Sequence, residues 1–547
     1  MMTPRLSRRR LVPWSFAVAA VMGSCNLHNP GVSPPSAVLS FPSALALSRE
    51  PMPRLLYVAN SNFDLRYNAG SLQSYNLDAL DRVLASNRCR SYGKLPAGDA
   101  GSRPFDDNTN YGMLGLLDAG PSDAGADDAG GLVLADDAGG LVLADAGSLD
   151  AGKGRVGAPI VLPGDYDLTS KYGNAQGFLC DGRDPAGYEG CCIDTGPELD
   201  AIRQSSFEID SFAVGVAVSP SNDRVYVPVS SRNQLLYFDV VNDQLACGDE
   251  TTRCRRGPGL KSADHVPYDN FPGSLSAMTV GTLSDLIPPA AANGLVLDAT
   301  YVATTHDLGG FGLFVEERDS AGTSSAPILD GVLRNLGQRP RSVLADPVRH
   351  VLYVASAGES YISRIALRVN PTVPGELGLR ATPYESSRIA VSGVSQAGDL
   401  RDMTFDPNNH DRLYVLIRGT QESVGFLDLD PTLKTNARLV DSVRIGAGPS
   451  KLALMVQDGR TFLLVTCYDS KSIYIIDAAE RALVAVVRSL SGPFTMAYDT
   501  SRKLLHVADF RSSVLRVVDL KGLTDRSEPP PRIVATIGSP QFEGALQ

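Results

Sequence analysis

The chain is organised by a repeated pattern of apolar runs separated by polar turns. Each copy has an apolar run, a turn with Asp, Asn or Pro, a second run with a Tyr-Val-like centre, a polar loop, and a third run that ends in Asp. The clearest copy covers residues 214–223, 225–229 and 234–239. Alternation of apolar and polar positions, together with many β-branched residues, predicts a strand in each run.

This pattern occurs seven times. The second runs of the copies cover residues 55–60, 225–229, 299–303, 352–355, 413–416, 462–466 and 504–509. Later apolar runs, such as 483–487 and 533–537, offer a fourth strand to a copy. In the second half of the chain the copies recur about every 40 to 60 residues, which is the spacing of four-stranded propeller blades. We therefore predict an all-β fold, a seven-bladed β-propeller whose blades bury their faces against one another.

Two of the second runs carry a more specific signature. Tyr57-Val-Ala-Asn60 and Tyr353-Val-Ala-Ser356 are near-matches to the YVTN sequence, and the seven copies together resemble the YVTN family of β-propeller repeats. The resemblance covers residues 42–85 and 212–537. It implies a propeller scaffold. Because members of such a family share a scaffold rather than a reaction, it implies no particular activity.

A propeller must join its last blade to its first, because an open ring would expose strand-rich faces to solvent. Two segments are candidates for this closure. Residues 38–41 precede the first copy, have the strand-like composition Val-Leu-Ser-Phe, and could add a strand to the final blade. In the alternative, residues 533–537 close the ring alone and the N-terminal segment is a tether.

A long insertion, residues 87–210, separates the inner strands of the first blade, residues 42–86, from the other blades in residues 211–537. Its centre, residues 118–152, consists of Asp-Ala-Gly units with eight Asp and no cation. Few large apolar groups and repulsion between carboxylates predict a disordered, low-complexity linker there. Residues 538–547 are expected to form a C-terminal tail.

The first 24 residues have the layout of a secretory signal peptide. Four arginines precede a short apolar run over residues 14–22, and small residues follow it. The run is shorter than the roughly 20 apolar residues that a membrane-spanning helix needs. Ser7-Arg8-Arg9-Arg10-Leu11 also resembles a twin-arginine signal, so the export route stays open between that pathway and the general one.

The end of this signal resembles the bacterial lipobox, Met22-Gly23-Ser24-Cys25, in which the cysteine is acylated and becomes the mature N-terminus. The resemblance implies a lipoprotein of the cell envelope, held at a membrane by lipid on Cys25, with residues 25–41 as a tether. The residue after the cysteine is Asn26. The absence of Asp at this position resembles signals that are sorted to the outer membrane. We therefore expect an outer-membrane location.

The negative net charge of the chain limits the kinds of partner that it can bind. The full chain carries -11 at pH 7, and removal of residues 1–24 takes away four Arg and no acid, which leaves -15. Binding to phosphate backbones needs a basic footprint, so we expect no nucleic-acid partner. No second apolar stretch is long enough to cross a membrane.

Seven cysteines remain besides Cys25. In an exported protein, cysteines form disulfides more often than they bind metal. Cys247 and Cys254 bracket a short polar loop and are predicted to form a local bridge. Four further candidates, whose pairing stays open, are Cys89, Cys180, Cys191 and Cys192. Cys467 lies in an apolar run and is predicted to be a buried free thiol.

In a propeller, the loops from second to third strands lie on the same face as the connections between blades. We therefore expect polar side chains of these loops to form a binding face. The candidate residues are Asn60, Asp64, Arg232, His306, Asp307, Glu359, Arg418, Glu422, Tyr468, Asp469, Asp509 and Arg511. Turn formation by Asp and Asn explains most such positions without a ligand.

The function that we predict is a binding or interaction scaffold for a protein or a glycan, without a cofactor. The alternative is a lactonase-like hydrolase with a divalent metal in the central channel, as in some propellers. His306-Asp307 is the pair most suited to metal binding or proton transfer. No Ser-His-Asp order, Gly-rich phosphate loop or paired metal-ligand spacing stands out, so the sequence favours binding.

Overall fold

The computed structural model describes residues 33–34, 38–49, 51–65, 67, 69–85, 191–193, 197–231, 233–246, 274–292, 297–316, 326–369, 381–392, 399–419, 421–429, 436–488, 490–525 and 527–538. Within them, nearly all regular structure is β-strand, which confirms the predicted all-β class. Four short 3-10 helices are η4 (Leu283–Asp285), η5 (Pro289–Ala291), η6 (Phe510–Ser512) and η7 (Lys521–Leu523).

The strands fall into antiparallel groups of four, each a meander in which neighbours in sequence pair. The first group is β1 (Pro42–Leu47), β2 (Leu55–Asn60), β3 (Gly70–Asn76) and β5 (Arg203–Ile209). The second is β6 (Ala217–Val218), β7 (Arg224–Val229), β8 (Gln234–Val241) and β9 (Gln244–Ala246). The third is β10 (Leu275–Thr282), β11 (Thr300–His306), β12 (Gly310–Glu316) and β13 (Ile328–Leu333).

Four more groups follow in the second half of the chain. The fourth is β14 (Pro340–Asp346), β15 (Val351–Ser356), β16 (Tyr361–Val369) and β17 (Ala381–Ser392). The fifth is β18 (Asp399–Asp406), β19 (Asn409–Arg418), β20 (Ser423–Leu429) and β21 (Asn436–Arg444). The sixth is β22 (Pro449–Gln457), β23 (Arg460–Cys467), β24 (Ser472–Asp477) and β25 (Ala482–Val487). The seventh is β26 (Pro493–Asp499), β27 (Leu504–Asp509), β28 (Val514–Asp519) and β29 (Arg532–Ile537).

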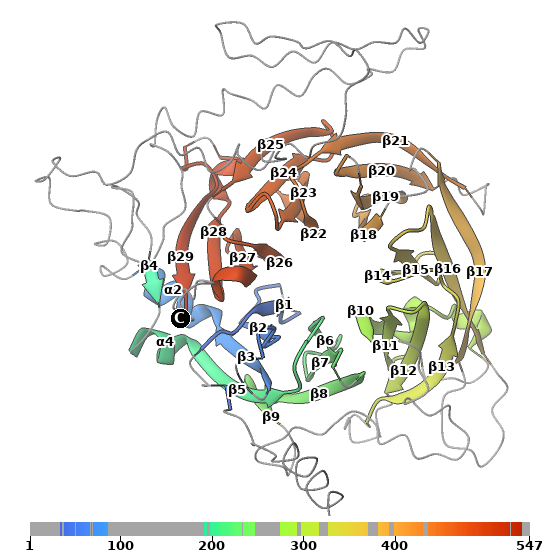
Figure 1. Cartoon of the computed structure of the whole chain (residues 1–547), viewed down its shortest axis with the longest axis horizontal. Helices are drawn as coiled ribbons and strands as arrows, with labels where there is room; N and C mark the ends of the chain where they lie inside the picture. Colours follow the sequence, from blue (N-terminus) through green and yellow to red (C-terminus); the bar gives the residue numbers. More distant parts are fainter. Residues whose placement is uncertain are drawn as a thin grey trace, which may run out of the picture.

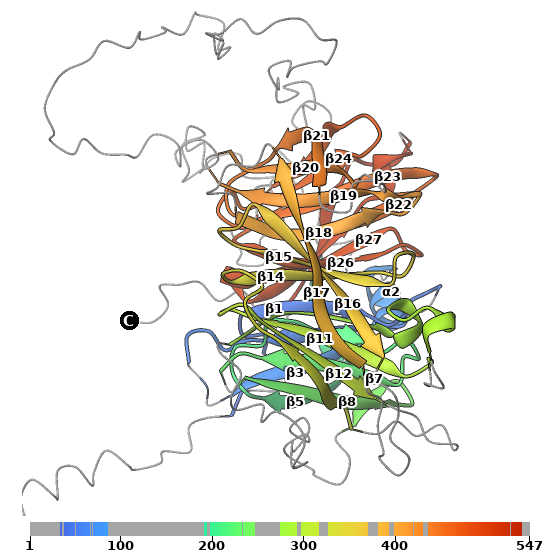
Figure 2. The ribbon, with the colours of Figure 1, turned by 90° about the vertical axis from the view of Figure 1, so that its right-hand side faces the viewer.

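The groups are arranged in a ring, with the first strand of each group nearest the centre (Figure 1). Innermost strands contact one another in chain order, and β26 contacts β1, so the ring is near-closed. Figure 2 shows the ring from its edge, with β16 and β17 facing the viewer. The outer strands β17 and β21 pair in parallel, which joins the fourth and fifth groups into one eight-stranded sheet.

The second strand of a group is the most deeply buried, because both of its faces meet neighbouring groups. In β2, Leu56 and Val58 belong to the core shared with the seventh group. Leu55, Tyr57 and Ala59 belong to the core shared with the second group. Burial on both faces explains why these runs are continuously apolar rather than alternating.

The first group is completed by a strand that follows the long insertion. β5 pairs antiparallel with β3 from Gly70 to Tyr75. Residues 203–209 therefore belong to the ring, and the insertion ends earlier than the predicted boundary at residue 210. Their sequence, Arg-Gln-Ser-Ser-Phe-Glu-Ile, has two large apolar residues, and most of its side chains are half-buried. The repeat pattern does not reveal such a strand.

The seventh group carries a fifth strand, which also comes from the insertion. β4 (Cys191–Ile193) pairs in parallel with β29. The chain then passes through α4 (Pro197–Ile202) into β5 of the first group. β29 is the fourth strand of the last group, so the alternative in which residues 38–41 supply a strand of the final blade is wrong. Those residues contact neighbouring loops instead; the Phe41 amide donates to Ser513 Oγ at 3.2 Å.

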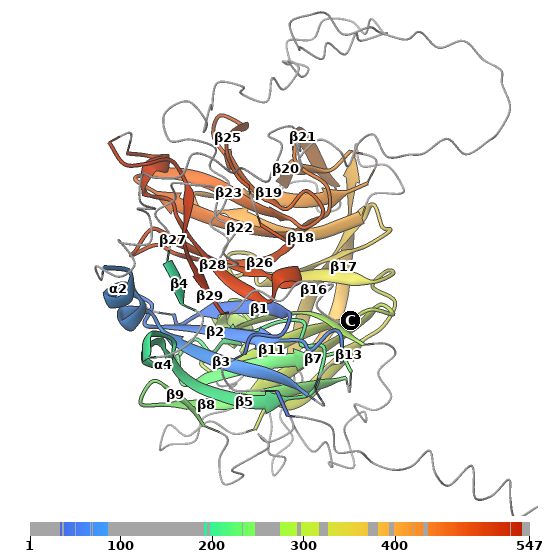
Figure 3. The ribbon, with the colours of Figure 1, turned by 60° about the vertical axis from the view of Figure 1, so that its left-hand side comes forward.

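An apolar core joins the first and seventh groups at the outer edge of the ring. Figure 3 shows α2 (Leu77–Ala85), α4 and β4 together at this edge. The core includes Leu80 of α2, Ile193 of β4 and Ile202 of α4, packed with side chains of β27, β28 and β29. The helix that precedes the insertion and two short elements from the last part of the insertion thus cover the junction between the first and last groups.

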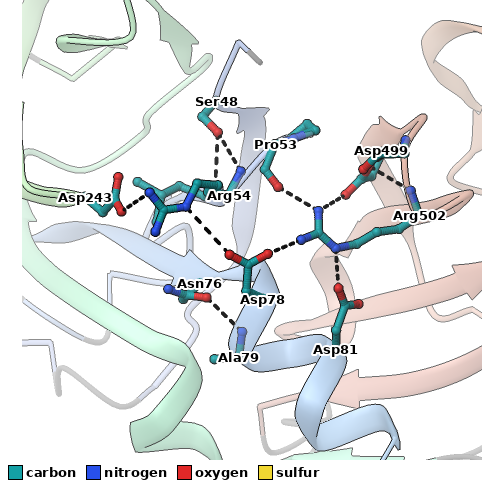
Figure 4. Close-up of polar contacts among 12 residues, drawn as sticks. Ser48, Pro53, Arg54, Asn76, Asp78, Ala79, Asp81, Asp243, Asp499 and Arg502 are labelled. Carbon is teal, nitrogen blue, oxygen red and sulfur yellow. Dashed lines mark hydrogen bonds and ion pairs between the residues drawn. The ribbon is translucent and has the colours of Figure 1, made fainter. Parts of the chain in front are cut away.

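A polar network reinforces this junction (Figure 4). Arg502, in the turn after β26, is nearly buried and pairs with Asp499 at 2.8 Å and Asp81 of α2 at 2.5 Å, and it also pairs with Asp78. Its guanidinium donates to the Pro53 carbonyl at 2.7 Å. One buried cation therefore links the last group to the turn and the helix of the first.

Candidate binding site on the loop face

One end of the ring carries the loops from second to third strands and the connections between groups; we call it the loop face. Many candidate residues of this face hold the connection that enters their own group. Asn60 Oδ1 accepts the Ser40 amide at 3.3 Å, and Asp307 Oδ1 accepts the Ser274 amide at 2.7 Å. Glu359 Oε1 accepts an amide of the connection at 3.2 Å in the same way. These side chains have a structural role.

Asp509 is a fully buried member of this set. Its carboxylate accepts the amides of Ser491, at 2.9 and 3.0 Å, and Gly492, at 2.6 Å. Arg516, on the neighbouring strand, donates to the same carboxylate at 3.3 Å. Both side chains are fully buried, so the pair is an internal clamp and does not face solvent.

The other candidates lie in different environments. His306 is fully buried at the end of β11, next to the Asp307 carboxylate that holds a connection. Asp64 is exposed in the loop after β2. Arg232 lies outside the described residues, as do Cys25, the tract 118–152 and the cysteine candidates Cys89, Cys180, Cys247 and Cys254. Cys191 and Cys192 lie in β4.

Five predicted residues come together across the fifth, sixth and seventh groups. Arg418 lies 3.8 Å from Asp469 and 3.9 Å from Glu422. Tyr468 is the neighbour of Asp469 in sequence, and the Arg511 guanidinium lies 5.4 Å from the centre of its ring. A cation at this distance is attracted by the electron-rich ring face. This corner of the loop face combines acceptors, cations and an aromatic ring.

An aromatic cluster extends from this corner towards the first two groups. Phe510 is its centre, with ring centroids 5.1 Å from Phe41, 5.6 Å from Phe63, 5.4 Å from Phe494 and 6.3 Å from Tyr468. A further member, Phe212, packs edge-on against Phe63 at 6.0 Å. The Phe63 side chain is 59% exposed and Phe494 is 39% exposed, so the cluster presents apolar surface to solvent.

These phenylalanines are not among the residues predicted from the sequence, because polar groups in the loops are what suggest a binding face there. The signal was present. Each lies in a second-to-third loop or at the start of an innermost strand, where the repeat otherwise places polar or small residues. Tyr468 and Phe510 both directly follow the second strand of their group, and an aromatic residue that recurs at one loop position indicates a surface patch once the fold is known.

A β-bulge recurs at the start of the innermost strands. The register shifts by one residue at Ser43, Ser276, Arg341, Arg401, Ser450 and Phe494. A bulge leaves one residue unpaired and re-aims its side chain, and bulges are common beside functional sites. Their side chains differ around the ring: Ser in three groups, Arg in the neighbouring fourth and fifth groups, and Phe in the seventh.

Cys467 is fully buried at the end of β23 and forms no disulfide with any described cysteine, which confirms its prediction as a buried free thiol. Burial raises the pKa of its thiol to about 12, so the group is protonated at neutral pH.

Among the described residues, no three His, Cys, Asp or Glu side chains are grouped so that they could hold a metal ion. Nor does any helix in the described ranges combine the length and the apolar character of a membrane span. The hydrolase alternative, with its divalent metal, stays a prediction.

Comparisons with known proteins do not assign this chain to a family. No family model and no curated protein matches the chain. Among solved structures, a protein from Lactobacillus plantarum is 11% identical with a TM-score of 0.40, over 82% of this chain and 84% of that one. A functionally unknown protein from Desulfotomaculum acetoxidans is 13% identical with a TM-score of 0.37, over 60% and 87%.

A third solved structure is a β-propeller domain. The β-propeller domain of Cps50 (Swd1) from Myceliophteria thermophila is 11% identical to this chain with a TM-score of 0.31, over 49% of this chain and 73% of that domain. Likenesses at this level carry no argument about the function of this chain. The candidate site therefore rests on its own residues.

Proposed function

We propose that this protein is a cell-envelope lipoprotein whose ring is a seven-bladed, YVTN-like β-propeller that binds a protein or glycan on its loop face. The observation that carries the binding role is the exposed aromatic cluster around Phe510, bordered by Arg418, Asp469 and Arg511. The blade count is supported by the seven antiparallel four-strand groups of the described residues.

Exposed aromatic clusters are unusual on a soluble surface and mark contact sites. Burial of Phe63 and Phe494 against a ligand would be favourable, because it removes apolar surface from water. Aromatic side chains also dominate the energetics of interfaces. Contiguous apolar patches rimmed by charged groups are characteristic of interaction sites. The neighbouring arginines and carboxylates supply the polar rim that fixes the orientation of a ligand.

The aromatic cluster gives a direct test of the binding role. The double variant Phe63→Ser/Phe494→Ser is expected to weaken ligand binding at least about tenfold, because truncation of a hot-spot side chain costs about 2 kcal/mol or more. The probes are an array of bacterial envelope glycans and a panel of purified envelope proteins, read by surface plasmon resonance.

A matched control removes two exposed apolar residues from elsewhere. Val241 and Val348 are exposed at the ends of β8 and β14, on the side of the ring opposite the loop face. Val241→Ser/Val348→Ser should keep the affinity of the unmutated protein. Equal affinity of the phenylalanine variant for every bound probe would overturn the binding role of the loop face.

The lipid anchor is tested separately. Cys25→Ser is expected to abolish acylation and to move the protein from the membrane fraction to the soluble fraction, because the thiol carries the lipid. Cell fractionation and the intact mass of the mature protein measure this. Asn29→Ser, in the tether, is the control and should remain in the membrane fraction. Solubility of the unmutated protein without detergent would contradict the anchor.

A further inference from the structure

The fourth and fifth groups place arginines at equivalent bulges of neighbouring innermost strands, Arg341 on β14 and Arg401 on β18. Burial lowers the pKa of the Arg401 guanidinium; Asp399 opposes this, and the positive charges of Arg341 and Arg418 add to the lowering. Arg418, on β19, is the register partner of Asp399 on β18, two residues before Arg401. The three arginines therefore lie at the loop-face ends of β14, β18 and β19.

These cations have few acceptors within the described residues. Arg341 has neither a hydrogen bond nor an ion pair there, and its buried Nε has no partner. Arg401 pairs with Asp399 at 2.5 Å through Nη2, while its own buried Nε is also without a partner. A buried donor that lacks an acceptor costs about 1–3 kcal/mol, and more when it is charged.

Two nearby carboxylates, Asp402 and Glu422, are engaged by other groups. Asp402 accepts Ser342 Oγ at 2.8 Å and the Leu452 amide at 3.0 Å, and it pairs with Lys451 at 3.0 Å. Glu422 accepts the Gly448 amide at 3.1 Å and stays 3.9 Å from the Arg418 guanidinium. Asp399 pairs with Arg401 through Oδ2, and its buried Oδ1 has no partner. The Nε groups of Arg341 and Arg401 thus remain as donors that no described acceptor uses.

We propose that Arg341, Arg401 and Arg418 form a binding site for an oxyanion, a carboxylate or a phosphate, on a ligand whose apolar part contacts the aromatic cluster. The planar guanidinium matches both anions with two parallel hydrogen bonds. Arg418 and Asp469 connect the site to Tyr468 and so to the phenylalanines. This inference rests on the proposed binding role and names the chemistry of the ligand.

The test uses three aromatic probes that differ in charge: benzoate, phenyl phosphate and neutral benzyl alcohol. Dissociation constants are measured by ligand-observed NMR on the full mature chain. The unmutated protein is expected to bind at least one anionic probe about tenfold or more tightly than benzyl alcohol, as expected for hydrogen bonds to a charged group. Tighter binding of benzoate or of phenyl phosphate identifies which oxyanion the site prefers.

Arg341→Gln should remove most of this preference and leave the affinity for benzyl alcohol unchanged. Arg341 holds no other group of the described structure, so the variant should fold. Arg438→Gln, an exposed arginine on the outer strand β21, makes the same charge change away from the site and should bind like the unmutated protein. Equal effects of the two variants, or no preference for anions in the unmutated protein, would overturn the oxyanion site. If Phe63→Ser/Phe494→Ser still loses binding, the proposed function survives that result.

Discussion

Asp509→Ala is expected to destabilise the protein by about 3 to 5 kcal/mol, the cost of breaking a fully buried ion pair by removing one partner. The variant leaves the Arg516 guanidinium without its carboxylate, and it also leaves the amides of Ser491 and Gly492 without an acceptor. The free energy of unfolding is measured by guanidinium chloride denaturation, followed by far-UV circular dichroism. The transition should move to lower denaturant.

Asp469→Ala is the matched control, since Asp469 is an exposed acid in the equivalent loop of the sixth group. Exposed ion pairs contribute about 0 to 1 kcal/mol, so this variant should unfold almost like the unmutated protein. A loss at Asp509 that is no larger than the loss at Asp469 would contradict the clamp.

Acidification from pH 7 to pH 4 is expected to remove about 3 kcal/mol of stability through His506 alone. Burial lowers the pKa of this imidazole to about 4, with Asp499 opposing the shift and Arg502 adding to it. Both ring nitrogens are buried without a partner. Because the unfolded chain takes up the proton near pH 6.5 and the folded chain only near pH 4, stability is full above pH 6.5 and falls between these values.

His506→Leu separates this contribution from the other titrating groups. The variant should have a much flatter dependence of unfolding free energy on pH between 6.5 and 4, measured by urea denaturation at each pH. His410→Leu, a half-buried histidine in the fifth group, should keep the slope of the unmutated protein. An unchanged slope in His506→Leu would show that other groups cause the acid sensitivity.

The sequence predicts the repeat units because their second strands are buried on both faces. Runs such as Leu55–Asn60 and Val351–Ser356 are continuously apolar and cannot be read as surface segments. The outer strands are harder to predict because only part of each is covered. Arg203–Ile209 is half-polar and is separated from its partner β3 by the insertion, and Cys191–Ile193 is too short to show a period.

The candidate site was predictable only in part. The sequence identifies the loops, and Arg418, Tyr468, Asp469 and Arg511 do meet there. It does not distinguish a carboxylate that binds a ligand from one that holds a backbone amide, since both occur as Asp or Glu after an apolar strand. That difference depends on connections from distant parts of the chain. The aromatic cluster has the same origin, because Phe41 and Phe510 are far apart in sequence.

The segment that runs through β4, α4 and β5 has a consequence for the order of folding. It pairs with the last sheet through β4 and completes the first through β5, so β4 has no partner strand until β29, which ends at Ile537, has been synthesised. Contacts between residues near 45 and residues near 500 carry the largest loop-closure entropy in the ring, and such contacts form slowly. The second to sixth groups can form from neighbouring segments, and closure of the ring is the step expected to limit the folding rate.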